Sequence, residues 1–252
     1  MFGDYLDPLA DEGYRLLLVD MRGHGRSDPA PPESVTLERL AADVDAIAAA
    51  LDLERYAVLG HSTGGFVALQ HAVDSPGEAA QTIISGGIPS ARFLDAAIAA
   101  VAGFEPEDLR AQVVASVEAE KTAQTAAEVE ALMRDQLPLH FADPRDPRLD
   151  EYARRSAGTI YRPEVLRQLA NNGYGAIEVE DRLGSIREPV LVLVGARDRV
   201  CPRAASEAIA AGAPRAELVV LERSGHFTFA EETDRYLDAL RDFLGRQTRA
   251  AA

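Results

Sequence analysis

The sequence predicts an α/β fold: a mostly parallel β-sheet with helices on both faces, interrupted by a helical insertion. Short apolar, β-prone runs alternate with runs whose apolar residues repeat at helical spacing, and a helix between two strands makes them parallel. Aromatic residues make up only 6% of the chain, whereas an all-β sandwich would be rich in aromatic and β-branched residues. With 252 residues, 47% of them hydrophobic, the chain can form one domain with a substantial core.

The first predicted elements are a strand and a helix. Residues 14–20, YRLLLVD, form a short apolar run that ends in the glycine-rich stretch DMRGHGRSD, which predicts a buried strand entering a turn. Thr36 is a suitable helix N-cap. Apolar residues then fall on one face of the predicted helix, at Leu37, Leu40, Val44, Ile47 and Leu51.

Four further strands are predicted, at residues 56–59, 81–87, 188–196 and 216–222. The first of these leads through the sequence GHSTGG into a helix with apolar residues at Phe66, Leu69 and Val73. A closing helix is predicted over residues 231–243.

Residues 89–186 break this alternation. They contain helical patterns such as VEALMRDQL and PEVLRQLA but no strand-like run. We therefore expect a helical cap inserted over the sheet. The cap divides one core domain into a first part, residues 1–88, and a second part, residues 187–252.

The charge balance excludes several classes of partner. The chain has 26 basic and 41 acidic residues, which gives a net charge of −15 at pH 7. Such a charge repels phosphate backbones and anionic lipid surfaces, and no local basic patch offsets it. We expect neither a nucleic acid nor a membrane as partner.

The cysteine content and the sequence motifs predict the cellular compartment and the absence of cofactors. The single cysteine, Cys201, excludes an intramolecular disulfide and a cysteine-based metal cluster, and it suits the reducing cytoplasm. The chain has no run of about 20 apolar residues and no signal-peptide pattern, so we expect a cytoplasmic protein. It also lacks HExxH, cysteine-cluster and P-loop motifs, which predicts neither a metal nor an organic cofactor.

The GHSTGG stretch is a G-x-S-x-G motif centred on Ser62, between a predicted strand and a predicted helix. A sharp strand-to-helix turn forces the serine into a strained backbone conformation, which the flanking glycines permit. The same turn directs the N–H of Thr63 and the start of the helix dipole toward the place where an oxyanion would form. The motif therefore predicts Ser62 as a nucleophile and Thr63 as an oxyanion-hole donor.

A serine nucleophile needs a histidine base. His226 follows the predicted strand at 216–222 directly, at the sheet edge where open α/β sheets place their sites. The side chain of His61, beside the nucleophile, is expected to point elsewhere. The remaining histidines lie in a turn, on a helix and in the cap: His24, His71 and His140.

The histidine in turn needs a carboxylate that orients it. Asp198 follows the predicted strand at 188–196, and the next predicted helix and strand separate it from His226, so neighbouring strands can bring the two loops together. Because an arginine lies on each side of Asp198, its carboxylate could instead form an ion pair at the protein surface. Asp181 is a more distant alternative.

With the chain order Ser62, Asp198, His226, the sequence resembles the α/β-hydrolase family. The DMRGHGRSD stretch is similar to the turn after that family's fourth strand, with matches at Asp20, Arg22, Gly23, Gly25 and Ser27. The resemblance covers almost all of the chain and implies a capped serine hydrolase. Such an enzyme cleaves a small-molecule ester or amide through an acyl-enzyme, with a Ser-His-Asp triad.

Within the family, the serine argues against haloalkane dehalogenases and epoxide hydrolases, which use an aspartate at this position. Residues 173–202 are similar to proline iminopeptidases, which hold the free amine of the substrate with cap carboxylates. This resemblance implies that Glu178 and Glu180, together with Asp181, are candidate substrate-binding residues. It also implies that the substrate is an N-terminal prolyl amide. A solvated acidic surface before a strand is the alternative.

The start of the chain departs from the family pattern. Members begin with further strands and a His-Gly-Gly-type loop that supplies the second oxyanion-hole donor, and Met1 falls after the matching position. Without the family's third strand, residues 14–20 and 56–59 lack the strand that joins them. We expect a start assigned too late; a shortened chain that re-pairs its strands is the alternative.

Two other functions stay open on this sequence. A C–C bond hydrolase acting on dienoic acids would use the same triad. A catalytically impaired protein of the same fold could instead bind ligands or partners through its cap. The oligomeric state and the substrate are not determined by the sequence.

Overall fold

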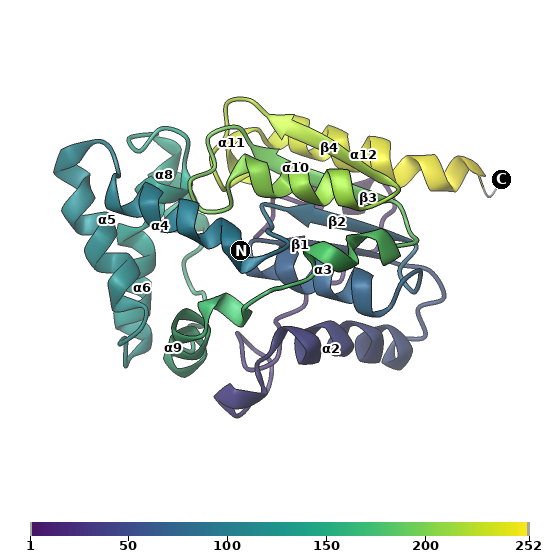
Figure 1. The fold of residues 1–252 in the computed structure, drawn as a ribbon, viewed down its shortest axis with the longest axis horizontal. Helices are drawn as coiled ribbons and strands as arrows, with labels where there is room; N and C mark the ends of the chain where they lie inside the picture. The colour runs from purple at the N-terminus through teal and green to yellow at the C-terminus, as the bar shows by residue number, and fades with distance from the viewer. Residues whose placement is uncertain (1, 251–252) are drawn as a thin grey trace.

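A computed structural model describes residues 2–250 and has a four-stranded, fully parallel sheet at its centre (Figure 1). The strands are β1 (Ala57–His61), β2 (Gln81–Ser85), β3 (Val190–Gly195) and β4 (Ala216–Leu221). They lie in the order β1-β2-β3-β4, and each pairs in parallel with the next. The predicted α/β class and four of the five predicted strands are confirmed.

The chain connects these strands through helices, as a parallel sheet requires. The α-helices are α1 (Asp7–Asp11), α2 (Leu37–Ala50), α3 (Thr63–Asp74), α4 (Leu94–Ala102), α5 (Glu107–Ala119), α6 (Ala126–Asp135), α7 (Leu137–His140), α8 (Arg148–Arg155), α9 (Pro163–Asn171), α10 (Arg203–Gly212), α11 (Thr228–Glu231) and α12 (Thr233–Ala250). Thr36 caps α2 as predicted, because its side chain accepts a hydrogen bond from the N–H of Arg39 at 3.3 Å.

Helices cover both faces of the sheet (Figure 1). Successive strand residues point to opposite faces: Ile84 and Val192 pack with α3 and α10, whereas Ile83 and Leu191 pack with α11 and α12. The inner strands β2 and β3 are buried along their whole length. They therefore form a rigid support for the loops at their carboxyl ends.

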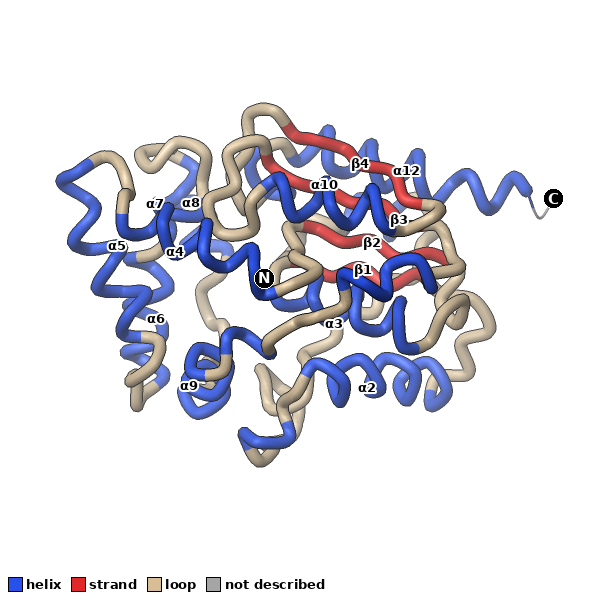
Figure 2. The backbone as a smooth tube through the Cα atoms, viewed as in Figure 1, coloured by secondary structure: helices blue, strands red, loops and turns tan. Residues whose placement is uncertain are grey.

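The strand predicted at residues 14–20 is wrong, because this segment has no regular secondary structure. Leu18 and Val19 are 57% and 52% exposed. Within residues 2–250, β1 pairs only with β2 and forms an edge of the sheet (Figure 2). An apolar run becomes a strand only when a neighbouring strand supplies backbone hydrogen bonds. Among the described residues, no strand pairs with residues 14–20.

Residues 89–186, the predicted cap, form helices α4–α9 and contribute no strand to the sheet. Helices α4, α5, α6 and α8 lie together beyond the carboxyl ends of the strands (Figure 1). An isolated antiparallel bridge between Ser90 and Glu178 joins the two ends of this segment. The division into cap and core stays a prediction.

Among residues 2–250, no helix combines the length and the apolar character that crossing a lipid bilayer requires.

Candidate active site

Ser62 occupies the turn between β1 and α3 in a strained backbone conformation, with φ 55° and ψ −125°. Its N–H donates to the carbonyl of Ser85 at the end of β2, at 2.9 Å, which holds the turn against the sheet. A Cβ atom on Gly60 would lie 1.9 Å from the carbonyl oxygen of Gly64. The first glycine of the motif is therefore required by the close approach of the chain to itself.

Thr63 is the first residue of α3. The first N–H groups of a helix have no partner within the helix and carry its positive dipole end. The Thr63 N–H is thus placed, next to Ser62, where it can stabilise negative charge. Its role as oxyanion-hole donor stays a prediction.

Asp198 lies in the turn that follows β3, and its side chain is fully buried. Oδ1 accepts hydrogen bonds from the N–H groups of Val200 and Cys201, both at 2.8 Å. Oδ2 faces Nδ1 of His226 at 2.8 Å. Arg199 donates instead to the carbonyls of Phe141 and Ala142, and among the described residues neither flanking arginine forms an ion pair with Asp198.

His226 lies on the loop between β4 and α11, with only 1% of its surface exposed. Because Nδ1 faces the Asp198 carboxylate, Nδ1 carries the proton in the neutral ring and Nε2 is an acceptor. Nε2 is buried and has no hydrogen-bond partner among the described residues, Ser62 included. The structure therefore brings Asp198 and His226 together and leaves Nε2 free.

Two further histidines surround His226, which sequence reasoning missed. The ring of His61 lies 4.6 Å from that of His226, centroid to centroid, and the ring of His140 lies at 5.6 Å. The expectation that His61 points elsewhere is wrong: the sequence shows its place beside Ser62 but not the direction of its side chain.

Burial keeps these two neighbours neutral. It lowers the pKa of His140 to about 4 and the pKa of His61 well below its usual range, and the nearby His226 ring lowers both further. Nδ1 of His140 is 2.9 Å from the carbonyl of Gln136. Of the three rings, only that of His226 is hydrogen-bonded to a carboxylate among the described residues.

Gly86, directly after β2, packs against the Asp198–His226 pair. Its φ is +57°, and a Cβ atom there would lie 3.0 Å from Cε1 of His226 and 3.4 Å from Oδ2 of Asp198. The predicted strand QTIISGG contained this glycine, but nothing in the sequence indicated what it approaches.

Ser62, Thr63 and His226 line a cavity of about 2080 Å³ that extends between the sheet and helices of the predicted cap. Its wall includes apolar cap residues such as Leu94 and Val101. Such a mainly apolar cavity suits a substrate with an apolar part. Within residues 2–250, no group of three or more His, Cys, Asp or Glu side chains could hold a metal ion.

The buried carboxylate of Glu120 also lines this cavity and was missed by sequence reasoning. It accepts hydrogen bonds from Nε2 of Gln136 at 2.6 Å and from the hydroxyl of Tyr174. Burial raises the pKa of Glu120, while these two donors oppose the rise.

The predicted substrate-binding glutamates lie near the end of residues 89–186, and neither lines this cavity. Glu178 accepts hydrogen bonds from the hydroxyl of Ser90 at 2.9 Å and from the N–H of Ala91 at 3.1 Å. Glu180 forms an ion pair with Arg92. Both carboxylates thus connect the two ends of residues 89–186, and their role in binding stays a prediction.

Comparisons with known proteins identify the family of this fold. Residues 2–233 match the family model for the alpha/beta hydrolase fold. The chain is 29% identical over 245 residues to a 2-hydroxy-6-oxononadienedioate/2-hydroxy-6-oxononatrienedioate hydrolase of Cupriavidus pinatubonensis, covering 97% of this chain and 81% of that protein.

Two further proteins are similar to this chain, one in sequence and one in fold. A proline iminopeptidase of Pestalotiopsis fici is 27% identical over 246 residues, with 94% and 83% of the two chains covered. Among solved structures, an esterase of Exiguobacterium antarcticum superposes with a TM-score of 0.74 at 23% identity, with 97% and 86% covered.

Proposed function

This chain belongs to the α/β-hydrolase family, and from that premise we propose that it is a serine hydrolase that cleaves a carboxylic ester or amide through an acyl-enzyme. The observation that carries the proposal is the buried Asp198–His226 hydrogen bond, which leaves Nε2 of His226 unpaired in a cavity that Ser62 also lines. In this arrangement a carboxylate orients a histidine base, and the base shares a cavity with a serine in a strained backbone conformation.

In the proposed mechanism, Oγ of Ser62 attacks the carbonyl carbon while Nε2 of His226 takes the hydroxyl proton. The Thr63 N–H stabilises the oxyanion. His226 then passes its proton to the leaving group, and water releases the acyl group by the same steps in reverse order. Hydrogen bonds between nucleophile and base are often long without substrate, so we expect the bond between Ser62 and His226 to form in the substrate complex.

The finer assignment concerns the substrate and its setting. We propose that helices α4–α9 act as a cap that selects a small-molecule ester or amide. We also propose that the protein works in the cytoplasm, because a single unpaired and buried thiol, Cys201, suits a reducing compartment. For a prolyl amide, Glu178 and Glu180 would hold the substrate amine. That amine would have to replace Arg92 at Glu180, because the two already form an ion pair.

The relative from Cupriavidus pinatubonensis favours a second candidate, C–C bond hydrolysis of a 2-hydroxy-6-oxo dienoic acid. A substrate screen separates the candidates: 4-nitrophenyl acetate, proline 2-naphthylamide and a 2-hydroxy-6-oxo dienoate. We expect ester hydrolysis together with covalent labelling of Ser62 by a fluorophosphonate. A folded chain that neither labels nor turns over any of the three would contradict the hydrolase and favour a binding protein.

Replacing Gly86 with alanine is expected to lower kcat/KM for 4-nitrophenyl acetate by about 100-fold, because the new Cβ displaces the His226 ring and small misplacements of catalytic groups are costly. Gly184→Ala is the matched control, since a Cβ at Gly184 meets open space. Equal rates for the two variants would show that Gly86 does not constrain the histidine.

A further inference from the structure

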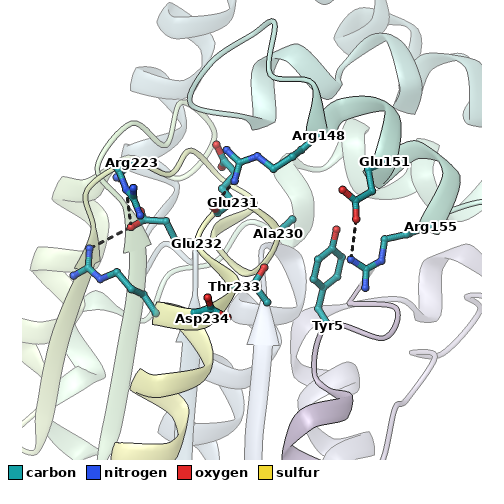
Figure 3. Close-up of a pocket in the computed structure, with 11 residues that line it drawn as sticks. Tyr5, Arg148, Glu151, Arg155, Arg223, Ala230, Glu231, Glu232, Thr233 and Asp234 are labelled. Carbon is teal, nitrogen blue, oxygen red and sulfur yellow. Dashed lines mark hydrogen bonds and ion pairs between the residues drawn. The ribbon is translucent and has the colours of Figure 1, made fainter.

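The loop that carries His226 is held by two glutamates of the following segment. Glu231 and Glu232 are both buried, and Figure 3 shows Glu232 beside Arg223 and Glu231 near Arg148. Oε2 of Glu232 accepts hydrogen bonds from the N–H of Arg223 and the hydroxyl of Ser224, both at 2.8 Å. Oε2 of Glu231 accepts from the N–H of Gly225, directly before His226, at 2.7 Å.

The second oxygen of Glu231 reaches a different part of the chain. Oε1 accepts a hydrogen bond from the N–H of Ala142, in the loop after α7, at 2.7 Å. One buried carboxylate therefore bridges the His226 loop and a segment of the predicted cap. Each oxygen satisfies one backbone N–H, and charged acceptors make the stronger bonds of this kind.

The two bridged segments are in direct contact. The N–H of His226 donates to the carbonyl of His140 at 2.6 Å. A Cβ atom on Gly225 would lie 2.6 Å from that same carbonyl oxygen and 2.7 Å from the nitrogen of Ala142. The Asp198 side is tied to the same segment, because Arg199 donates to the carbonyl of Phe141 at 2.7 Å. Small shifts of the segment around residue 141 would thus reach His226.

Glu231 lies outside the catalytic cavity. It lines a separate cavity of about 340 Å³ together with Arg148 and Glu232 (Figure 3). Burial raises the pKa of Glu231 to about 7, and the N–H groups of Ala142 and Gly225 oppose that rise. The ionised carboxylate therefore depends on the two backbone bonds that it makes.

We propose that Glu231 is a positioning residue, whose carboxylate sets the place of the His226 imidazole by joining Gly225 to Ala142. The inference rests on the proposed hydrolase function and extends it to a residue that does not touch the substrate. A glutamine at this position has one acceptor oxygen, so its amide group would face one of the two N–H donors and break that bond.

The matched control is Glu188. This glutamate is also buried and also accepts a backbone N–H, that of Gly77, at 2.9 Å, as well as the hydroxyl of Thr82 at 3.0 Å. It precedes β3, at the end of the sheet opposite Ser62. Glu188→Gln therefore removes the same kind of contact without reaching the site.

We expect Glu231→Gln to lower kcat for 4-nitrophenyl acetate by about 10- to 100-fold with little change in KM, as misplacement of a catalytic group does. Glu188→Gln should leave kcat unchanged even if it lowers Tm as much. Glu231→Asp keeps the charge with a shorter reach, so it provides a second variant with a smaller fall in kcat should the glutamine variant fail to fold.

A readout without turnover separates this inference from the proposed function. By NMR, the wild type should show slow exchange of the Gly225 and Ala142 amides and a low-field proton on Nδ1 of His226. Glu231→Gln should weaken all three signals, and Glu188→Gln should weaken none. NMR signals that stay unchanged in Glu231→Gln, or equal losses of kcat in the two glutamine variants, would overturn the positioning role. A wild type that shows these NMR signals but hydrolyses no substrate would overturn only the hydrolase function.

Discussion

Replacing Ser62 with alanine is expected to lower kcat for 4-nitrophenyl acetate by about 10⁴- to 10⁶-fold and to abolish labelling by a fluorophosphonate. The alanine removes the only oxygen that can form the acyl-enzyme, while the Thr63 N–H at the start of α3 remains. Residual hydrolysis above the rate in water would then measure the oxyanion-hole contribution. Stopped assays and intact-protein mass spectrometry provide the two measurements.

The backbone at Ser62 supplies a control for folding. Alanine meets the same strain at φ 55° as serine does, so Ser62→Ala should leave Tm close to that of the wild type. Ser62→Gly should raise Tm, because glycine adopts positive φ freely and strain at such a position costs about 1–3 kcal/mol. Ser185→Ala, which alters an exposed hydroxyl outside the cavity, should change neither activity nor labelling. Labelling that persists in Ser62→Ala would exclude Ser62 as the nucleophile.

Asp198→Asn is expected to lower kcat by about 10³- to 10⁴-fold without a change in the fold. The N–H groups of Val200 and Cys201 would keep the single amide oxygen at the Oδ1 position. The amide NH₂ would then face Nδ1 of His226 in place of the carboxylate oxygen. The imidazole would have to adopt the other tautomer, with its proton on Nε2, and could no longer accept the proton of Ser62.

The control for this variant is Asp181→Asn. Asp181 was the alternative carboxylate on sequence grounds, and it is exposed on the segment before β3. We expect Asp181→Asn to retain full activity on 4-nitrophenyl acetate, which has no amine for a carboxylate to bind. If Asp198→Asn kept more than a tenth of the activity while Asp181→Asn lost it, the orienting role would belong to Asp181.

Much of the fold could be predicted because it depends on local patterns. Apolar runs bounded by turns identified β1 to β4, and helical spacing identified α2 and α3. The same local pattern failed at residues 14–20, which contain four consecutive apolar residues, Leu16 to Val19, but stay outside the sheet. Strand propensity describes how a segment fits a sheet, and it does not say whether a neighbouring strand is present.

The candidate site likewise has one part that the sequence predicted and another that depends on contacts between distant segments. A parallel sheet brings its carboxyl ends to one edge, so chain position alone predicted that the loops of Ser62, Asp198 and His226 would meet there. The Asp198–His226 bond agrees with that prediction. The family resemblance also suggested Glu178 and Glu180 as candidate amine ligands, a role that stays a prediction. Their hydrogen-bond and ion-pair partners, Ser90 and Arg92, lie at the other end of residues 89–186, far along the chain.

By itself, the sequence determined the order of the strands β1 to β4 and their connecting helices, the strained serine turn, and the edge of the sheet at which the proposed chemistry lies. These depend on hydrophobic spacing, glycine geometry and the parallel connection, which are properties of short segments. Only the tertiary structure decided which groups surround His226: Gly86 against its ring, His61 and His140 beside it, and Glu231 behind its loop. Each of those contacts depends on side-chain direction and on packing between distant segments, which local patterns do not encode.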